Sequence, residues 1–226
     1  MSKVVIFGCG QGADIAFRYL ANDSPHEICG FAVDKAFLDK SRFHDLPVVA
    51  HETIEQAFPP NTFKLFIPLG FQKMNRLRAQ KYLDAKGRGY GFVSYVSSNI
   101  FRVAPIAVGE NCFILENQSI NLDVRIGNNV VIWSGNQIGD RSVIEDHVWI
   151  TSQVAIAGDV VVGESSFLGI NSTISNNVVL APGTFVGANA LITKNTVKNG
   201  VYLVEGSKAL PMDSEKFMGI VDATMR

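Results

Sequence analysis

The sequence predicts a small α/β unit followed by a parallel β-helix. Apolar runs alternate with helical patterns in the first unit, over residues 1–96, and a six-residue apolar period dominates the second, over residues 97–200. The composition is a third observation, because 47% of the residues are hydrophobic and only 18% are charged. Soluble domains carry about 25% charged residues. Such a chain is expected to be ordered, and its uncharged surface favours an oligomer.

Glycine-bounded apolar runs predict buried parallel strands in the first unit. The predicted strands are Val4–Gly8, Glu27–Asp34, Leu65–Gly70 and Gly91–Val96. Apolar residues at helical spacing predict one helix after the first strand and a second helix over Lys73–Ala85. Asn75 and Arg78 are expected on the surface of this second helix, with Arg78 within reach of a cleft. The β-α-β order predicts a small parallel sheet.

Every sixth residue from Val108 to Ile192 is Val, Ile or Leu, fifteen times in succession. With about three such residues in ten by chance, this run has a probability on the order of 10⁻⁸. The intervening series is Ile114, Ile120, Ile126, Ile132, Ile138, Ile144, Ile150, Ile156, Val162, Leu168, Ile174, Leu180 and Val186. A fixed hexapeptide period predicts short rungs, three to a triangular coil, and residues 108–197 correspond to five coils.

The last segment breaks this period. Residues 201–226 contain Pro211 and Gly219 and are predicted to form a C-terminal cap, with a short helix over Ser214–Val221. A cap is expected because the open end of a stack of coils is an unpaired sheet edge.

Charge and composition exclude several classes of partner. The net charge is −1 and no long basic block occurs, which argues against nucleic acid and anionic membranes. No apolar run approaches the roughly 20 residues of a membrane span, and the N-terminal residues lack a signal-peptide pattern, so a cytoplasmic location is expected. The three cysteines, Cys9, Cys29 and Cys112, are predicted to be reduced and buried.

Four segments carry a resemblance to a known family. They are IFGCGQGADIA, KMNRLRAQKYLDAKGRGYGFVSYV, IWSGNQIGDRSVIEDHVWI and GDVVVGESSFLGINSTI. The chain resembles the left-handed β-helix sugar acyltransferases, in particular sialic-acid O-acetyltransferases and the N-acetyltransferases of nucleotide-linked amino sugars. The resemblance implies a Rossmann-like N-terminal unit that holds a nucleotide sugar and a β-helix that binds acetyl-CoA. It also implies a homotrimer with an active site in each cleft between neighbours.

One departure from the family concerns the general base. Relatives carry a histidine at the position of Asp140 and often a second one near Trp149 or Gln153, whereas His147 is the only histidine of the β-helix here. Asp140 is therefore either the base or a solvated turn carboxylate. His147 is expected at an outward-facing corner, as an alternative base or as a solvated side chain.

The missing histidine bears on the acceptor. A sugar hydroxyl needs a base with a pKa near neutrality, and an aspartate is a weak one unless burial raises its pKa. A sugar amine is partly neutral at pH 7–8 and depends less on a base. The sequence therefore favours an amine acceptor.

The resemblance also implies residues for the acyl donor. Gly158 matches a glycine whose backbone N–H faces the thioester carbonyl, and Ile170 and Gly187 match the wall along which pantetheine runs. Trp149 either packs in the core or lines the thioester pocket. No metal is expected, because β-helix carbonic anhydrases need three histidine ligands and this β-helix has one.

The first glycine-rich turn predicts the substrate site. Gly8, Gly10 and Gly12 form G-x-G-x-G, which misses the dinucleotide fingerprint G-x-G-x-x-G. Asp34 follows about 22 residues later, where Rossmann units place a ribose-binding acid. Taken alone these residues suggest NAD, but beside a β-helix they favour the nucleotide of a sugar, with phosphate near the helix start at Gly12.

The predicted function is thus an acetyl-CoA-dependent N-acetyltransferase for a nucleotide-linked amino sugar in surface polysaccharide (lipopolysaccharide) synthesis. The alternatives are O-acetylation of a sugar hydroxyl, a catalytically silent β-helix that binds nucleotide sugars or scaffolds a partner, and, more distantly, an NAD-linked dehydrogenase.

Overall fold

The computed structural model describes residues 1–225, and it begins with a small sheet. The strands of this sheet are β1 (Lys3–Phe7), β2 (Glu27–Val33), β3 (Arg42–Phe43), β4 (Leu46–Ala50) and β5 (Phe63–Phe66). Their order is β3-β4-β2-β1-β5, and all neighbours are parallel except β3 with β4. The predicted parallel β-α-β unit is therefore confirmed.

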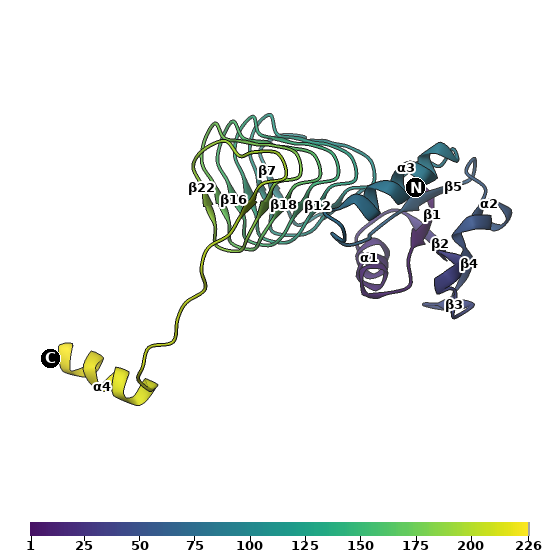
Figure 1. The fold of residues 1–226 in the computed structure, drawn as a ribbon. Helices are drawn as coiled ribbons and strands as arrows, with labels where there is room; N and C mark the ends of the chain where they lie inside the picture. The colour runs from purple at the N-terminus through teal and green to yellow at the C-terminus, as the bar shows by residue number, and fades with distance from the viewer. Residues whose placement is uncertain (226) are drawn as a thin grey trace.

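Helices cover both faces of this sheet. They are α1 (Gln11–Asn22), η1 (Lys35–Phe37), η2 (His51–Thr53), α2 (Ile54–Ala57) and α3 (Arg76–Gly87). Buried residues of α1 pack with one face of the sheet, while α2 and α3 pack with the other. Helix α3 also lies against the neighbouring β-helix, as Figure 1 shows. The small sheet is thereby held between its own helices and the second unit.

The second unit is a stack of two-residue strands. They are β6 (Tyr95–Val96), β7 (Phe101–Arg102), β8 (Ala107–Val108), β9 (Phe113–Ile114), β10 (Ser119–Ile120), β11 (Arg125–Ile126), β12 (Val131–Ile132), β13 (Gln137–Ile138), β14 (Val143–Ile144), β15 (Trp149–Ile150), β16 (Ala155–Ile156), β17 (Val161–Val162), β18 (Phe167–Leu168), β19 (Thr173–Ile174), β20 (Val179–Leu180), β21 (Phe185–Val186), β22 (Leu191–Ile192) and β23 (Val201–Tyr202). They form three parallel sheets of five, six and seven strands.

All fifteen predicted apolar anchors are the second residue of a strand, from Val108 in β8 to Ile192 in β22. Fourteen of them are buried and pack into one continuous core inside the stack, and Val108 packs partly buried against it. Strands pair with the strand 18 residues later, as Gln137 does with Ala155, which is the register of a three-sided coil; the last pair, β21 with β23, is separated by 16 residues. The hexapeptide interpretation is confirmed.

The corners between strands repeat a left-handed backbone conformation. Positive φ recurs every six residues at positions where most residues are Asn, Asp or Gly. The series is Asn111, Asn117, Asp123, Asn129, Gly135, Arg141, His147, Gln153, Asp159, Ser165, Asn171, Asn177, Gly183 and Asn189. Asn, Asp and Gly tolerate this conformation best, which explains why they recur at the corners. Arg141, His147, Gln153 and Ser165 are the departures.

We call the three sides of the stack the domain face (β6 to β21 in steps of three, then β23), the second face (β7 to β22 in steps of three) and the third face (β8 to β20 in steps of three). Outward residues of the domain face, including Phe113, Val131 and Trp149, share a core cluster with α1 and the small sheet. The α/β unit is therefore packed directly on one side of the stack.

Two boundaries differ from the prediction. Tyr95 and Val96 were expected at the end of the small sheet, but they pair with β9 and form the first rung of the stack. At the other end, Val201 and Tyr202 pair with β21 as its last rung. The stack thus begins two residues before the predicted boundary at 96/97 and ends two residues after the one at 200/201.

The expected C-terminal cap is wrong for residues 203–225. These residues leave the stack as an extended segment that ends in α4 (Ser214–Thr224), well separated from the rest of the chain in Figure 1. All are exposed except Val221, which is half-buried. The helix itself was predicted, and the Asp213 side chain caps it by accepting a hydrogen bond from the Lys216 backbone N–H at 2.8 Å. We call residues 203–225 the C-terminal arm.

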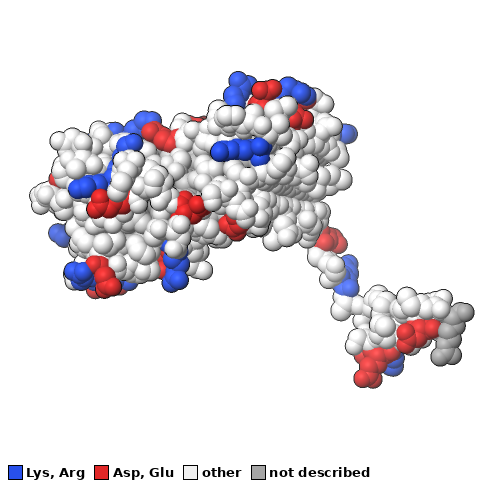
Figure 2. All heavy atoms as spheres, turned by 180° about the vertical axis from the view of Figure 1, so that it is seen from behind, with Lys and Arg blue, Asp and Glu red and all other residues white. Residues whose placement is uncertain are grey.

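Charged side chains are sparse over the stack in the view of Figure 2. No helix within residues 1–225 is long and apolar enough to cross a bilayer. All three cysteines are free, as predicted, although only Cys112 is buried and Cys9 and Cys29 are half-buried.

Candidate functional site

A cavity of about 350 Å³ lies where the small sheet meets the domain face of the stack. Its lining comes from the turn after β1, the segment after β5 and the domain face: Phe7, Gly8, Gly10, Gln11, Gly12, Ala13, Ile15, Pro68, Leu69, Gly70, Gln72, Phe113, Val131, Trp133 and Trp149. The chain runs from β1 to β2 on one side and later adds β5 on the other. The cavity therefore occupies the crevice at which open α/β sheets bind ligands.

The glycine-rich turn forms one side of this cavity. Gly8 adopts a φ of +107°, which favours glycine. Gly10 is the N-cap of α1 and provides no side chain to bond the first-turn N–H groups. An uncapped helix start of this kind presents N–H donors and the positive end of the helix dipole to an anion. The structure therefore brings the predicted residues Gly10 and Gly12 together at a cavity.

Two tryptophans form the opposite side. The ring centroids of Trp133 and Trp149 are 6.2 Å apart. Trp149 is buried, and its indole Nε1 has no hydrogen-bond partner among residues 1–225. Its ring also contacts Phe71 edge-on, with the centroids 5.6 Å apart. Trp149, expected either in the core or at the thioester pocket, belongs to a buried core cluster and lines this cavity opposite the glycine turn.

Asp34 does not line the cavity. It follows β2, and its carboxylate pairs with the Lys81 ammonium from α3. The cavity lies between the ends of β1 and β5, whereas β2 lies on the other side of β1. The expected ribose-binding position is therefore occupied by an ion pair in this chain.

Arg78 is the main residue that the sequence interpretation missed. Expected on the helix surface, it is fully buried between α3, the segment after β5 and the corners of the stack. Its guanidinium donates to the carbonyls of Asn129 and His147, the latter at 2.9 Å, and lies 5.2 Å from the centroid of the Trp149 ring. Burial lowers the pKa of Arg78 to about 9, so the group remains charged at neutral pH.

His147 is buried as well, contrary to the expected outward-facing corner. It is 6% exposed, lies under α3 and contacts the ring of Tyr82 edge-on. Its Nδ1 is 2.9 Å from Nδ2 of Asn129. Burial is the main cause that lowers the pKa of His147, and the nearby Arg78 charge adds to it, whereas Asp146 and Glu164 oppose it.

Asp140 and Gly158 lie on successive coils at the corner between the second and third faces. Asp140 is half-buried, and its Oδ1 accepts a hydrogen bond from the Leu122 N–H at 3.1 Å. Asp146 bonds the Asn128 N–H in the same way at 2.7 Å. The Gly158 N–H, expected to face a thioester, donates to Asn176 Oδ1 at 3.0 Å. Both residues therefore have a structural partner within the chain.

Ile170 and Gly187 lie together at another corner, between the domain face and the second face. Ile170 is exposed, while Gly187 is buried, and the Ile170 carbonyl bonds the Asn189 N–H at 2.9 Å. Within one chain the width of the second face separates these two residues from Asp140 and Gly158. Gly158, expected at the thioester, and Ile170 and Gly187, expected along the pantetheine, therefore lie on two different edges of the stack.

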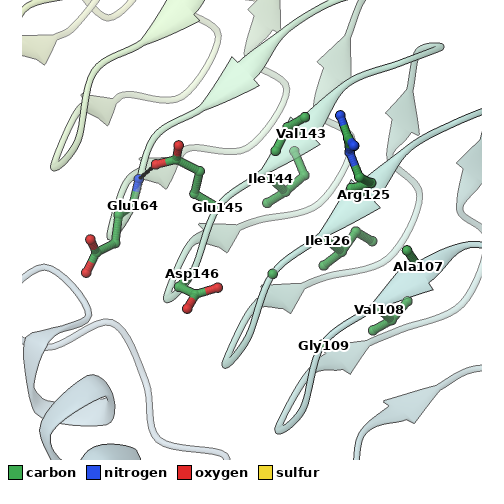
Figure 3. A pocket seen from close by; sticks show the side chains of 11 residues that line it. Ala107, Val108, Gly109, Arg125, Ile126, Val143, Ile144, Glu145, Asp146 and Glu164 are labelled. Carbon is green, nitrogen blue, oxygen red and sulfur yellow. Dashed lines mark hydrogen bonds between the residues drawn. The ribbon is translucent and has the colours of Figure 1, made fainter.

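A second depression of about 650 Å³ lies open on the third face. Figure 3 shows Glu145, Asp146 and Glu164 together at one edge of it and Arg125 apart from them. Neither Asp140 nor His147 lines it. Among residues 1–225, no group of three or more His, Cys, Asp or Glu side chains could hold a metal ion.

Comparisons with known proteins place the fold. No family model and no curated protein matches the chain. Perosamine N-acetyltransferase from Caulobacter crescentus, solved as a histidine mutant with CoA and GDP-perosamine, aligns over 89% of this chain and 93% of its own, with a TM-score of 0.76 and 22% identity. The acetyltransferase domain of PglB from Neisseria gonorrhoeae aligns over 89% and 96%, with a TM-score of 0.74 and 14% identity.

WeeI from Acinetobacter baumannii aligns over the same shares of the two chains as PglB, with a TM-score of 0.72 and 15% identity. The chain has the fold of these proteins. The predicted Rossmann-like unit followed by a left-handed parallel β-helix is thereby confirmed. Each of these alignments covers 89% of this chain, so the shared fold accounts for nearly all of it.

Proposed function

We propose that this protein is an acetyl-CoA-dependent N-acetyltransferase whose acceptor is the amine of a nucleotide-linked amino sugar. The cavity between the glycine turn and the domain face is the observation that carries the proposal. It joins an uncapped helix start, suited to a diphosphate, to an apolar and aromatic wall. The structural neighbour from Caulobacter crescentus was solved with CoA and GDP-perosamine.

The reaction transfers an acetyl group from sulfur to nitrogen. The neutral sugar amine attacks the thioester carbonyl, the new N–C bond forms, and the C–S bond breaks as the tetrahedral intermediate collapses. The amine loses one proton, and the departing CoA thiolate takes one up, so the sum of protons is unchanged. Asp140, at a corner of the stack and half-buried, is the proposed acceptor of the amine proton.

His147 is a poor second candidate for this role. Its Nδ1 faces the Nδ2 of Asn129, a donor, so the ring proton lies on Nε2. A neutral imidazole that is protonated on Nε2 and bonded through Nδ1 has no free lone pair for a substrate. We therefore propose that His147 holds the corner in place and does not accept the proton.

The acetyl-CoA is proposed to lie along the stack between neighbouring copies, against Gly158, Ile170 and Gly187. The exposed side chain of Ile170 offers an apolar contact for an extended pantetheine arm. A homotrimer of parallel stacks in the cytoplasm, working in surface polysaccharide synthesis, completes the proposal. Light scattering tests the assembly, which should have three times the chain mass of 24.6 kDa.

The decisive experiment measures CoA release with a panel of UDP-, GDP- and dTDP-linked 4-amino sugars beside their hydroxyl analogues. Faster turnover of the amines supports the proposal. Faster turnover of the hydroxyl sugars would establish O-acetylation instead. No CoA release with any member of the panel, together with tight nucleotide-sugar binding, would favour the silent scaffold.

A further inference from the structure

Hydrogen bonds from side chains of the stack fix one wall of the cavity, although that wall follows a strand of the small sheet. This wall consists of Pro68, Leu69 and Gly70, the residues that follow β5. The residue before them, Ile67, bonds the Asn111 side chain through both its N–H, at 2.8 Å, and its carbonyl, at 3.4 Å. We call residues 67–70 the wall segment.

Arg78 holds the other end of the wall segment. Its Nη1 donates to the carbonyls of Leu69 and Gly70 at 3.4 and 3.3 Å. The same guanidinium donates through Nε and Nη2 to Asn129, His147 and Val148, which belong to two successive corners of the stack. One side chain thus connects the cavity wall to the corners.

The burial of Arg78 is energetically costly. Its hydrogen-bond acceptors are carbonyl oxygens and the Asn75 Oδ1, and no carboxylate pairs with it within residues 1–225. A buried charge without a counter-charge has a large desolvation cost, which is offset here by hydrogen bonds to carbonyls that an apolar side chain would leave unpaired. The guanidinium is therefore the group that ties the carbonyls of the wall segment to those of the stack corners.

A ladder of amide side chains supports the same segment, and its direction is fixed. Because the Ile67 N–H can only donate, Asn111 accepts through Oδ1 and donates through Nδ2 to Asn129 Oδ1 at 2.7 Å. Asn129 must then donate through Nδ2 to His147. The ladder therefore runs from the cavity wall to the corner that also binds Arg78.

The opposite side of the wall segment touches the glycine turn. A Cβ atom on Gly12 would lie 2.7 Å from the carbonyl oxygen of Pro68, so the first turn of α1 and the wall segment are already in contact. A displacement of the wall by a fraction of an ångström therefore changes the space at the helix start. The position of that wall depends on groups that lie outside the cavity.

We propose that Arg78 is a positioning residue for the nucleotide part of the substrate, acting through the wall segment without contacting the ligand. This inference rests on the proposed function of the cavity. Replacing the guanidinium frees the carbonyls of Leu69 and Gly70 and lets the wall move relative to Gly12. The proposed acyl-CoA residues lie on other edges of the stack and are unaffected.

The test compares Arg78→Met and Arg78→Lys with Arg76→Met, a matched control on the exposed side of the same helix. We expect Arg78→Met to raise the KM for the nucleotide sugar at least about tenfold, with kcat and the KM for acetyl-CoA changed by less than about threefold. Arg78→Lys should restore part of the loss, because an ammonium keeps the charge but spans fewer carbonyls. Arg76→Met should match the wild type.

Tryptophan fluorescence provides a readout that does not depend on turnover. The chain has two tryptophans, and both line the cavity, so emission and its quenching by acrylamide report on this site alone. We expect Arg78→Met to alter quenching without ligand, and to weaken quenching by added UDP or GDP. If Arg78→Met does not fold, Asn111→Ala tests the same wall from its other end.

Two results would overturn the inference. One is an equal rise in KM for both substrates, and the other is a lower melting temperature with an unchanged KM and unchanged fluorescence. Failure of the proposed function is a separate outcome, in which the wild type neither binds nucleotides nor releases CoA. The unliganded fluorescence of Asn111→Ala, which keeps the contact between Arg78 and Trp149, would still report whether the wall is held from the stack.

Discussion

Gly12 and Pro68 lie so close that the first turn of α1 has no room for a side chain at this point. A Cβ atom on Gly12 would lie 2.7 Å from the carbonyl oxygen of Pro68, whereas one on Gly10 would meet nothing within 4 Å. The two glycines belong to the same turn and were predicted together as substrate-binding residues. Their packing nevertheless differs completely.

Gly12→Ala should therefore destabilise the protein by about 1–3 kcal/mol, since the clash is with backbone that Arg78 and Asn111 hold in place. Gly10→Ala is the matched control and should leave stability within about 0.5 kcal/mol, because its φ of −96° suits any residue. Chemical denaturation of the two variants measures the difference. Equal stabilities would mean that the wall segment yields easily.

Asp140→Asn should lower kcat/KM at least about tenfold, because the amide removes basicity. Its Oδ1 can still accept the Leu122 N–H, so the corner stays capped. Asp146→Asn is the control, since Asp146 caps Asn128 in the same way. His147→Ala should reduce kcat/KM less than Asp140→Asn does. Equal, mild effects of the Asp140 and His147 variants would mean that no side chain acts as the base.

The lowered pKa of His147 makes stability depend on pH. The folded protein holds the imidazole neutral, while the unfolded chain protonates it below its ordinary pKa of 6.5. This contribution is complete above pH 6.5 and is lost as the pH falls through the window below it.

Urea unfolding at pH 7.5, 6.5 and 5.5 should show this loss, and His147→Asn should reduce the slope. Asparagine suits the left-handed corner and can accept the Asn129 bond. His26, whose pKa is also lowered, mainly by burial, retains its share of the slope in this variant. A slope unchanged by His147→Asn would contradict the prediction.

Ile174 and Thr173 are neighbours on β19 with opposite environments, one fully buried in the stack and the other exposed. Ile174→Ala should cost about 2–5 kcal/mol, because the coils above and below cannot collapse into the space. Thr173→Ala should change stability by less than about 0.5 kcal/mol. Thermal or urea unfolding of the two variants measures how much one buried anchor contributes to the free energy of unfolding.

The stack was predictable from sequence because its determinants are local. An apolar anchor such as Ile144 recurs every six residues and always faces the interior of the stack. The period alone therefore assigns the fold of the whole region. The small sheet was predicted less completely. Tyr95 and Val96 end an ordinary apolar run, and the sequence of such a run does not indicate whether its partner strand is β5 or β9.

The environments of Arg78 and His147 could not be predicted for a related reason. Burial of Arg78 depends on how α3 packs across two corners of the stack, which no short pattern in the helix encodes. His147 occupies a corner position at which Asn is usual, and this substitution was the available signal. The series of corner residues marks Arg141, His147, Gln153 and Ser165 as exceptions.

The 18-residue register restricts how this protein can change in length. Removing one residue between β8 and β22 would turn every later anchor away from the interior, and removing six would leave a coil without one of its sides. Only insertions or deletions of whole coils preserve all three sheets. Each such step moves the C-terminal arm relative to the cavity by about 4.8 Å. Among proteins that evolve from this one, the distance between the cavity and the C-terminal arm can therefore change only in steps of one coil.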